Sequence, residues 1–563
     1  MTTYKLIVPN SRDMKFDVTN AYTLSAIPIP VGFNPFSHKM FNQDIFTFND
    51  GVVDILHSSA RSMKVIPGVL VLENSQTYGK IDDKFLYKCI PDDQSLPIFI
   101  VPYKLRLGFN KNIKNKYVVF EFRNWTSKHP LGSLTQTLGD VDSLEYFYEY
   151  QLYCKSLYAS IRIINKKTMQ KLKEKTREQY IDMIIKSRDL KDYRETRNIF
   201  SIDPEKSKDF DDAFDIENLT EGKKRISIYI SNVSFWLDAL DLWDSFSDRI
   251  STIYLPDRKK PMLPTVLSDV LCSLTEGGNR FAFELQLIID EHKVVDYKFY
   301  NCVIKLEKNL RYDTAEQENY PDYKELFKTV TMMNRNKKYT ESIDSSHDVV
   351  AYLMILMNYL SAKELIKLKG GIFRSAKFSQ TFIPPEELPK DVKKFLKNWN
   401  CQGGKYSKDV ADHDMLELDA YVHITSPIRR LVDLLNMIVL QDKLGWEMSA
   451  KSKEFYERWT SDSSIEYINA TMKSIRRVQN DCSLLKICMD DATIQETVYD
   501  GYIFDKLMRK DAMYQYIVYL PEINMTNRFT SRFDKENLSC QKFKIYVFTD
   551  QHSLKRKIRV EVQ

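Results

Sequence analysis

The segment Asp203-Pro-Glu-Lys-Ser-Lys-Asp209-Phe-Asp211-Asp212-Ala places four aspartates within ten residues and is the most informative stretch of the chain. Neighbouring side chains of a regular strand point to opposite faces, so Asp211 and Asp212 cannot converge there unless the chain curves. Pro204 and the polar residues after it permit such a loop. The alternating residues that follow, through Gly222 to Arg225–Ile230, predict a β-hairpin with the acids at its mouth.

Converged carboxylates repel one another unless a cation neutralises them. Because the segment contains neither His nor Cys, its oxygen ligands favour a hard ion such as Mg²⁺ or Mn²⁺. A calcium EF-hand is disfavoured, since Phe214 occupies the position of its required glycine when counting starts at Asp209. The spacing alone fits a metal site and a solvated acidic turn equally well.

The bulk composition is that of an ordinary globular protein. The chain has 563 residues, of which 28% are charged and 43% hydrophobic, and this length suggests about three or four domains. The 82 basic and 77 acidic residues leave a net charge of only +5, so any nucleic-acid contact requires local basic patches. Lys104–Lys116 and Lys555–Arg559 are two candidate patches.

The eight cysteines are scattered without a C-x-x-C pair, which excludes the usual zinc spacing and indicates free thiols in a reducing compartment. No apolar run reaches the ~18 residues of a transmembrane helix, so we expect no membrane partner. The first residues lack the apolar region of a secretory signal. We therefore expect a cytoplasmic protein, with the nucleus as the alternative.

Element patterns divide the chain into four parts. Residues 1–150 contain short strand-like runs separated by Pro, Gly and Asn, which predict one or two small barrels. Residues 151–195 are rich in Lys and Glu and predict one or two linking helices. Residues 196–490 mix strand patterns with an apolar helix from about Ser345 to Leu368, and a further helix is expected to start near Pro427. Residues 491–563 return to short alternating strands.

Three separated motifs carry a resemblance to a known family. The acidic segment resembles the D-P-x-x-x-x-D-x-D-D-A signature of the ribonuclease II/RNB exoribonucleases. Tyr254-Leu-Pro-Asp-Arg-Lys-Lys-Pro-Met-Leu-Pro-Thr-Val-Leu-Ser-Asp-Val-Leu-Cys-Ser-Leu is similar to the family's Y-x-P-x-x-x-x-P-M-L-P-x-x-L-S-x-x-L-C-S-L. Tyr421-Val-His-Ile-Thr-Ser-Pro-Ile-Arg-Arg-Leu-Val-Asp433 is similar to Y-x-H-F-T-S-P-I-R-R-Y-x-D. Their order argues against a chance match.

The resemblance implies a multidomain α+β protein. A mixed α/β RNB catalytic domain over 196–490 would be flanked by cold-shock or OB-like barrels over 1–150 and an OB-like, S1-type barrel over 491–563. Residues 151–195 would be a helical linker. The segment from Trp125 to Val141 looks like the end of the barrel that precedes the catalytic domain in eukaryotic exosome-type members. No room is expected for the extra N-terminal nuclease domain of the nuclear exosome subunit.

The resemblance also implies processive hydrolysis of single-stranded RNA from its 3′ end to nucleoside 5′-monophosphates. Asp203, Asp209, Asp211 and Asp212 would hold one or two Mg²⁺ ions, with Mn²⁺ as a substitute, and Asp211, Asp212 and Arg429 would be catalytic. We expect RNA as the principal partner and a monomer in catalysis. An RNA helicase or an exosome-like complex would be the protein partners.

RNA contacts are expected from Tyr254, Arg374, Ser426, Arg429 and Arg430. Tyr254 matches the family's aromatic residue near the terminal nucleotide, where stacking is independent of base identity. Ser426-Pro427 predicts a helix N-cap and first position, which would place both arginines in the first turn. Positive charge there opposes the helix dipole, and a bound phosphate would remove the conflict. We assign Arg429 to this phosphate; Arg430 can instead pair with Asp433.

Other residues have less certain roles. His413 and His423 are expected to be buried histidines that satisfy a hydrogen bond. Gln479 stands where the family often has an acid, which would make the local field more positive. Two other interpretations are an RNB-type RNA-binding scaffold without catalysis, which the complete set of aspartates argues against, and an endonuclease or DNase that uses the same ions.

Overall fold

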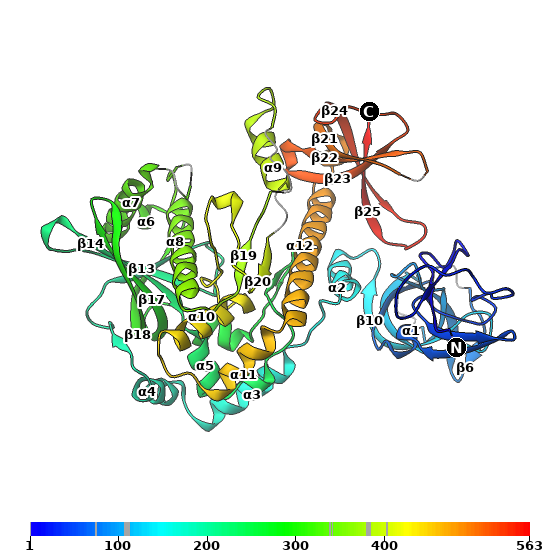
Figure 1. Cartoon of the computed structure of the whole chain (residues 1–563), viewed down its shortest axis with the longest axis horizontal. Coiled ribbons are helices and arrows are strands. Elements are labelled where there is room, and N and C mark those ends of the chain that lie inside the picture. Colours follow the sequence, from blue (N-terminus) through cyan, green and yellow to red (C-terminus); the bar gives the residue numbers. More distant parts are fainter. Residues whose placement is uncertain are drawn as a thin grey trace. The chain divides into compact units, whose positions relative to one another are not determined.

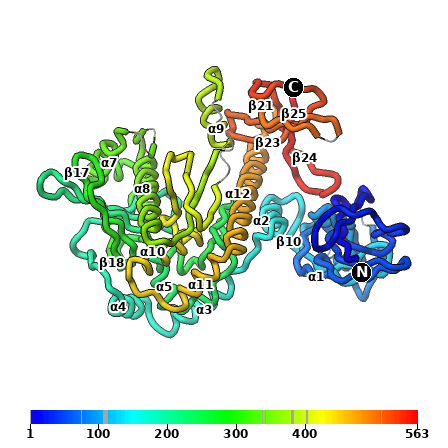
Figure 2. Tube along the Cα trace, viewed as in Figure 1, coloured from blue at the N-terminus to red at the C-terminus, as the bar shows by residue number. Residues whose placement is uncertain are grey.

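The structure, a computed structural model, describes residues 2–73, 76–105, 113–336, 339–340, 342–378, 384–400, 404–509 and 511–563. The chain forms two compact units (Figure 1, Figure 2). The first unit comprises Met1–Tyr158, Leu255–Asp257 and Arg477–Gln563, and the second comprises Ala159–Tyr254 and Arg258–Arg476. The boundaries expected near residues 150, 195 and 490 stay predictions, because this division groups both ends of the chain together.

The second unit is built on a six-stranded sheet. Its strands, in spatial order, are β11 (Lys191–Asp192), β18 (Lys293–Arg311), β12 (Ile199–Asp203), β13 (Asp212–Asn218), β14 (Lys224–Ser231) and β17 (Asn279–Asp290). β17 also pairs with β18, so the sheet closes on itself. β12 runs parallel to β18 and antiparallel to β13. The predicted hairpin is confirmed: β13 and β14 pair antiparallel, with Asp212 opposite Ile230.

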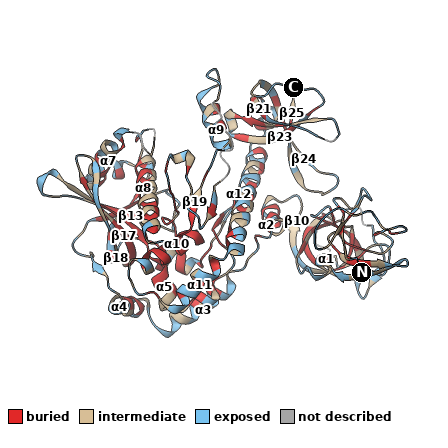
Figure 3. Ribbon diagram, in the orientation of Figure 1, coloured by how far each residue is buried: buried red, intermediate tan, exposed pale blue. Residues whose placement is uncertain are grey.

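Both faces of this sheet are buried (Figure 3). On one face, Phe200, Phe214 and Ile228 belong to a large apolar core that includes helical residues such as Leu353. On the other face, Ile199, Ala213 and Tyr229 belong to a smaller core. The alternation expected for a half-exposed strand therefore distributes side chains between two cores.

Helices cover the larger core. α8 (Ser346–Lys367) confirms the helix predicted from the apolar spacing, and Ser345 caps it by accepting a hydrogen bond from the Asp348 amide over 3.3 Å. α8 is long and apolar enough to cross a membrane by composition, but its residues Val349, Leu353 and Leu356 lie in the apolar core, as in a buried core helix. Figure 1 shows α8 and α10 beside the sheet.

The remaining elements of the second unit are short. The helices are α3 (Arg162–Glu174), α4 (Arg177–Ser187), α5 (Val233–Ala239), α6 (Ala315–Asn319), α7 (Pro321–Met333), α9 (Lys390–Asn400), α10 (Leu431–Lys443) and α11 (Ala450–Trp459). Two strand pairs are β15 (Ile253–Tyr254) with β16 (Lys259–Lys260), and β19 (Phe373–Ser375) with β20 (Lys405–Ser407). α12 (Asp462–Asp490) carries Gln479 and spans the division between the units.

The expected start of a helix near Pro427 is wrong. α10 begins at Leu431, and residues 427–429 form a turn in which the Arg430 amide donates to the Ser426 carbonyl over 3.0 Å. Arg430 has an extended backbone and pairs with Ser251. Because this strand-like pairing uses the backbone just before Leu431, the helix cannot extend back to Pro427.

The first unit contains three sheets. Residues 4–57 form the sheet β2 (Asp17–Asn20), β1 (Tyr4–Ile7), β3 (Ile45–Asn49) and β4 (Val52–His57), and a short α1 (Ser59–Ser62) follows. The second sheet is β5 (Ile66–Leu70), β9 (Lys116–Asn124), β10 (Leu131–Asp140), β8 (Phe99–Tyr103), β7 (Lys84–Pro91) and β6 (Lys80–Ile81). Pairing of β5 with β7 closes this sheet into a barrel, after which α2 (Leu144–Cys154) begins.

The C-terminal sheet has the order β23 (Met525–Ser531), β22 (Tyr514–Leu520), β21 (Val498–Met508), β24 (Cys540–Thr549) and β25 (Arg556–Val562), with α13 (Thr493–Glu496) before it. Each of the three sheets has its own apolar core. The predicted multidomain α+β class with small flanking β-barrels is therefore confirmed.

Three cations of the predicted patch Lys555–Arg559 form ion pairs. Lys555 forms an ion pair with Asp92, Lys557 with Asp550 over 2.8 Å, and Arg559 with Glu561 over 2.8 Å. In the other patch, residues 106–112 lie outside the described residues. The seven cysteines in the described ranges are all free thiols, as expected.

Candidate active site

The acidic loop lies between β12, which ends at Asp203, and β13, which begins at Asp212. A neighbouring segment holds this loop. The Phe210 amide donates to Ser273 Oγ over 3.0 Å, Ser273 Oγ donates to the Lys208 carbonyl over 2.9 Å, and the Leu274 amide donates to the Phe210 carbonyl over 2.9 Å. All four aspartates line one cavity of about 910 Å³, so the loop provides the curvature that neighbouring acids require.

Two of the four aspartates already have a cationic partner. Lys259 Nζ lies 2.9 Å from Asp209 Oδ1 and 3.3 Å from Asp269 Oδ1. Asp211 is almost fully buried, at 3% exposure, and accepts from the Ile428 amide and from Arg429 Nε, each over 3.0 Å. Asp209 and Asp211 are therefore neutralised by side chains of the protein itself.

The other two aspartates have an oxygen without a partner. Oδ2 of Asp203 and Oδ2 of Asp212 are buried and make no hydrogen bond. Burial raises the pKa of Asp203 to about 7, and Asp211 and Asp209 add to the effect. Burial, followed by the charges of Asp203 and Asp211, raises the pKa of Asp212 well above its usual value. Ionising both carboxylates in this cavity is costly unless a cation enters.

The residues fit a cation, but they do not form a complete cage. Over the described ranges, no group of three or more His, Cys, Asp and Glu side chains is arranged so that it could hold a metal ion. Asp209 is held by Lys259 and Asp211 by Arg429. The unpaired oxygens of Asp203 and Asp212 are the atoms available to a hard cation.

Backbone pairing joins the segment just before Tyr254 to Arg429 and Leu431. The Thr252 amide donates to the Arg429 carbonyl over 2.9 Å, and the Leu431 amide donates to the Ile250 carbonyl over 2.9 Å. Tyr254, two residues after Thr252, is 42% exposed and lines the same cavity as Arg429. The exposed Tyr254 and the Arg429 side chain, which is 41% exposed, thus lie in one cavity with the acids.

Side-chain hydrogen bonds, rather than a helix, organise residues 426–430, the segment predicted to bind a phosphate. Ser426 Oγ accepts from Arg429 Nη2 over 2.9 Å, and the Ser426 amide donates to Asp433 Oδ1 over 2.8 Å. Arg430 Nη2 also donates to Asp433 Oδ1 over 2.8 Å, which is the pairing considered as its alternative role. Ser426, Arg429 and Arg430 all line the cavity, and Arg429 is the more exposed of the two arginines.

Arg374 does not line this cavity. It lies on β19, and its guanidinium faces the Tyr406 ring at 5.6 Å. The Tyr406 hydroxyl is 2.7 Å from Nδ1 of His423, so the expected hydrogen bond is present, and His423 is half-buried. His413 is buried, as expected, and its Nδ1 makes no hydrogen bond. Burial lowers the pKa of His413 to about 4 and that of His423 well below its usual value.

Sequence reasoning missed several residues of the cavity. Lys259 and Asp269 belong to the second motif but had no assigned role, and their ion pairs could not be seen from spacing. Tyr312, His347 and Asn358 also line the cavity. Asn358 is the one with a sequence signal, because it is polar within the apolar α8. It donates to the Tyr421 hydroxyl over 3.0 Å and accepts from the Ile424 amide over 2.9 Å, which fixes the segment that leads to Ser426.

Comparison with known proteins agrees with the three motifs. Residues 188–320 and 318–445 match the RNB domain. Ribonuclease R of Aquifex aeolicus is 26% identical over 324 residues, which are 44% of this chain and 46% of that protein. The chain thus spans less than half the length of this curated relative.

Solved structures share the fold at low sequence identity. Mycoplasma genitalium RNase R in complex with ribose-methylated single-stranded RNA superposes with a TM-score of 0.68 at 14% identity, covering 99% of this chain and 100% of that one. Yeast Ssd1, described as a pseudonuclease, superposes with a TM-score of 0.57 at 14% identity, covering 94% of this chain and 78% of that one. One architecture therefore occurs in a ribonuclease and in a pseudonuclease.

Proposed function

Because this chain belongs to the RNB family, we propose that it is a hydrolytic 3′-to-5′ exoribonuclease that degrades single-stranded RNA to nucleoside 5′-monophosphates. The observation that carries the proposal is the single cavity in which four aspartates, Tyr254 and Arg429 meet. Its volume of about 910 Å³ lies in the range of pockets that enclose small ligands, about 300–1,000 Å³.

In the proposed reaction, Tyr254 stacks on a base near the 3′ end, and Arg429 contacts the phosphate to be cleaved. Stacking is sequence-tolerant, since every base has a π face, and is worth about 1–3 kcal/mol per base. Arg429 suits the phosphate because a guanidinium binds two oxygens at once. Its partner Ser426 and its backbone bonds to the Thr252 segment fix its direction before RNA arrives.

Asp203 and Asp212 would hold Mg²⁺, with Mn²⁺ as a substitute, and Asp209 and Asp211 would join them when an RNA phosphate pairs with Lys259 and Arg429. Such an ion supplies Lewis-acid activation of a phosphate and lowers the pKa of water. Within the chain, Asp211 orients Arg429, and Lys259 neutralises Asp209.

A second candidate function is an RNA-holding scaffold without catalysis. The likeness to the yeast pseudonuclease and the neutralising ion pairs of Asp209 and Asp211 favour it. The complete set of four aspartates opposes it, because all four line the cavity and two retain unpaired oxygens.

One assay separates these functions. The protein is incubated with a 5′-labelled single-stranded RNA, the same sequence as DNA, and a 3′-blocked RNA, each with Mg²⁺ and with EDTA. We expect a ladder that shortens from the free 3′ end of the RNA only and that EDTA abolishes. Internal cuts in the blocked RNA would instead indicate an endonuclease. Binding of RNA without any product would indicate the scaffold and overturn the exonuclease.

A further inference from the structure

Lys259 binds two aspartates of the acidic cavity at once. Its Nζ lies 2.9 Å from Oδ1 of Asp209 and 3.3 Å from Oδ1 of Asp269, and all three side chains line the cavity. An ammonium has three N–H donors, and these carboxylates take two of them. Among the described residues Lys259 has no further acceptor, so its third donor can bind an acceptor that enters the cavity, such as a phosphate oxygen.

A strand pair places Lys259 beside the proposed base platform. β15 and β16 pair antiparallel, and Lys259 lies directly opposite Tyr254. Directly opposed side chains lie on the same face of a strand pair, with Cβ atoms about 4.5–5.5 Å apart. A nucleotide whose base stacks on Tyr254 therefore lies next to the Lys259 ammonium.

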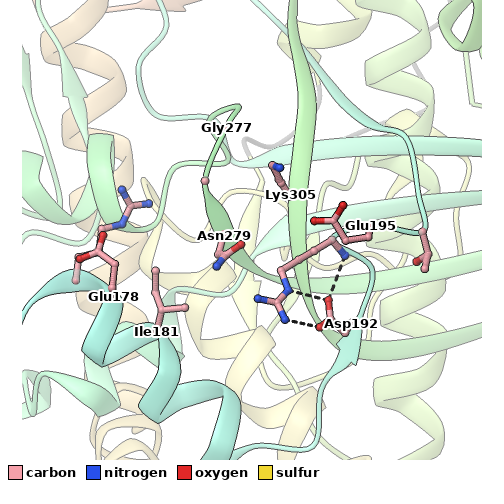
Figure 4. A pocket seen from close by; sticks show the side chains of 11 residues that line it. Glu178, Ile181, Asp192, Glu195, Gly277, Asn279 and Lys305 are labelled. Atoms are coloured by element: carbon pink, nitrogen blue, oxygen red, sulfur yellow. Dashed lines mark hydrogen bonds and ion pairs between the residues drawn. The ribbon is translucent and has the colours of Figure 1, made fainter.

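The ion pair of Lys259 differs from a surface ion pair elsewhere in the same unit. A second cavity, of about 830 Å³, lies beside α4, and Figure 4 shows the hydrogen bonds that Asp192 accepts there. Their donor, Arg194, is two positions away, and the Asp192 side chain is about half exposed, so water screens this pair. The Asp209 side chain is largely buried, so its attraction to Lys259 is screened less. Displacing Lys259 from Asp209 is therefore the more costly of the two.

The ammonium occupies a position that a divalent ion would need. Oδ1 of Asp209 and Oδ1 of Asp269 both contact Nζ of Lys259, so an ion bound to these two oxygens would have to displace the ammonium or lie beside it. Like charges that close repel each other. Oδ2 of Asp203 and Oδ2 of Asp212, in contrast, are buried without a partner. The acids of the cavity are thus divided between one ammonium and one open position for a cation.

Given the proposed nuclease function, on which this inference rests, we propose that the site binds one divalent ion and that the Lys259 ammonium supplies the positive charge of a second. Asp203 and Asp212 hold the one ion, and Lys259, held by Asp269, donates to an oxygen of the phosphate to be cleaved. In sites with two ions, the second lies about 3.5–4 Å from the first and stabilises the same phosphate. Lysine binds phosphate as a point charge, so it can supply this charge without a metal. Lys259 and Asp269 both stand where the second motif leaves the residue unspecified, so the motif itself does not require this pair.

Electron paramagnetic resonance tests the number of ions. It counts the Mn²⁺ bound per chain without RNA, and it detects the spin coupling of two ions about 3.5–4 Å apart, with and without a short ribose-methylated single-stranded RNA. We expect one ion per wild-type chain and no coupled signal in either condition. Lys259→Gln should bind a second Mn²⁺ at least about tenfold more tightly than the wild type does, with a coupled signal. Lys259→Arg keeps the charge and should bind one ion.

The matched control is Lys206→Gln, which removes the same charge from the same cavity but leaves the ion pairs of Lys259 intact. It should bind one ion. A coupled pair of ions in the wild type, which needs no variant to observe, would overturn the proposal, as would a single ion in Lys259→Gln. Equal gains in Lys206→Gln and Lys259→Gln would also overturn it, because they would show a general effect of charge. None of these outcomes depends on RNA cleavage, so the RNA ladder assay tests the nuclease function separately.

Discussion

Arg429 Nε donates a hydrogen bond to Asp211 Oδ2 over 3.0 Å, so the cation that we assign to phosphate and an acid of the expected metal set neutralise each other. The pair is anchored on both sides. Asp211 also accepts from the Ile428 amide, and Arg429 also donates to Ser426 Oγ. Both side chains are thereby held in one geometry, from which either can bind a ligand.

The first prediction concerns Asp211→Asn. The change keeps the side-chain shape and removes the charge, so we expect turnover of RNA to fall by about 100-fold or more, the scale for loss of one charge-stabilising group. RNA affinity measured in EDTA should be retained, because Arg429 loses a competing partner. Single-turnover rates and equilibrium RNA binding check both parts.

The matched control for this prediction is Glu205→Gln in the same loop. Glu205 has an exposed side chain, at 76%, and only a 3.6 Å ion pair with Arg311. The control should keep the wild-type rate. An unchanged rate in Asp211→Asn would remove Asp211 from the catalytic residues.

The second prediction is that the four aspartates contribute unequally to metal affinity. Asp203→Asn and Asp212→Asn remove the unpaired oxygens, so each should weaken Mn²⁺ binding by about tenfold or more. Asp209→Asn should have a smaller effect, because Lys259 already neutralises Asp209. Electron paramagnetic resonance of free and bound Mn²⁺ measures all three affinities without RNA.

Lys259→Gln tests the same inequality in metal affinity from the other direction, by removing the partner of Asp209. Removing the ammonium frees Asp209, so Mn²⁺ should bind more tightly than in the wild-type protein. Equal losses in Asp203→Asn, Asp209→Asn and Asp212→Asn, together with no gain in Lys259→Gln, would contradict the inequality.

The features that sequence predicted correctly are those determined by local pattern. The alternation before and after Gly222 was sufficient for the β13–β14 hairpin, and the apolar spacing of 346–367 was sufficient for α8. The Asp set, Tyr254 and Arg429 meet in one cavity because motifs far apart in the chain come together through the sheet and the Thr252–Arg429 backbone pairing.

The features that sequence did not predict depend on long-range contacts. Ser426-Pro427 has the local signals of a helix start, yet the bridge between Arg430 and Ser251 keeps the backbone extended until Leu431. The Lys259–Asp209 ion pair joins residues 50 positions apart, and no spacing rule indicates it.

The third prediction concerns pH. Burial raises the pKa of Asp203 to about 7 and that of Asp211 to about 6, whereas an unfolded Asp titrates near pH ~3.9. Between these values the native protein binds more protons than the unfolded chain, so these groups make the free energy of unfolding fall as pH rises from about 4 to about 7. Added Mg²⁺ should oppose this loss, and most strongly above about pH 7, where the carboxylates are ionised.

Urea unfolding in EDTA at several pH values checks this prediction by comparing the free energy of unfolding of Asp203→Asn with that of the wild type. His413 and His423 have lowered pKa values and destabilise the protein as pH falls, which is the opposite trend. Subtracting the wild-type curve from that of Asp203→Asn removes their contribution. The stability gained by Asp203→Asn should grow with pH between about 4 and about 7, whereas Glu205→Gln should follow the wild type. A pH-independent difference would contradict the raised pKa of Asp203.

The last prediction concerns Tyr254, whose exposed ring lies beside Arg429 in the acidic cavity. If the ring stacks on a base, Tyr254→Ala should weaken RNA binding by about 1–3 kcal/mol, and Tyr254→Phe should restore most of it. Tyr467→Ala is the matched control. Tyr467 lies on α12 in the same unit, is similarly exposed at 40%, donates its hydroxyl to the Asp248 carbonyl, and does not line the acidic cavity. Fluorescence anisotropy with RNA in EDTA measures the affinities. Stacking predicts equal losses for purine and pyrimidine 3′ ends within about threefold, whereas a hydroxyl contact would make Tyr254→Phe as weak as Tyr254→Ala and exclude the ring as the platform.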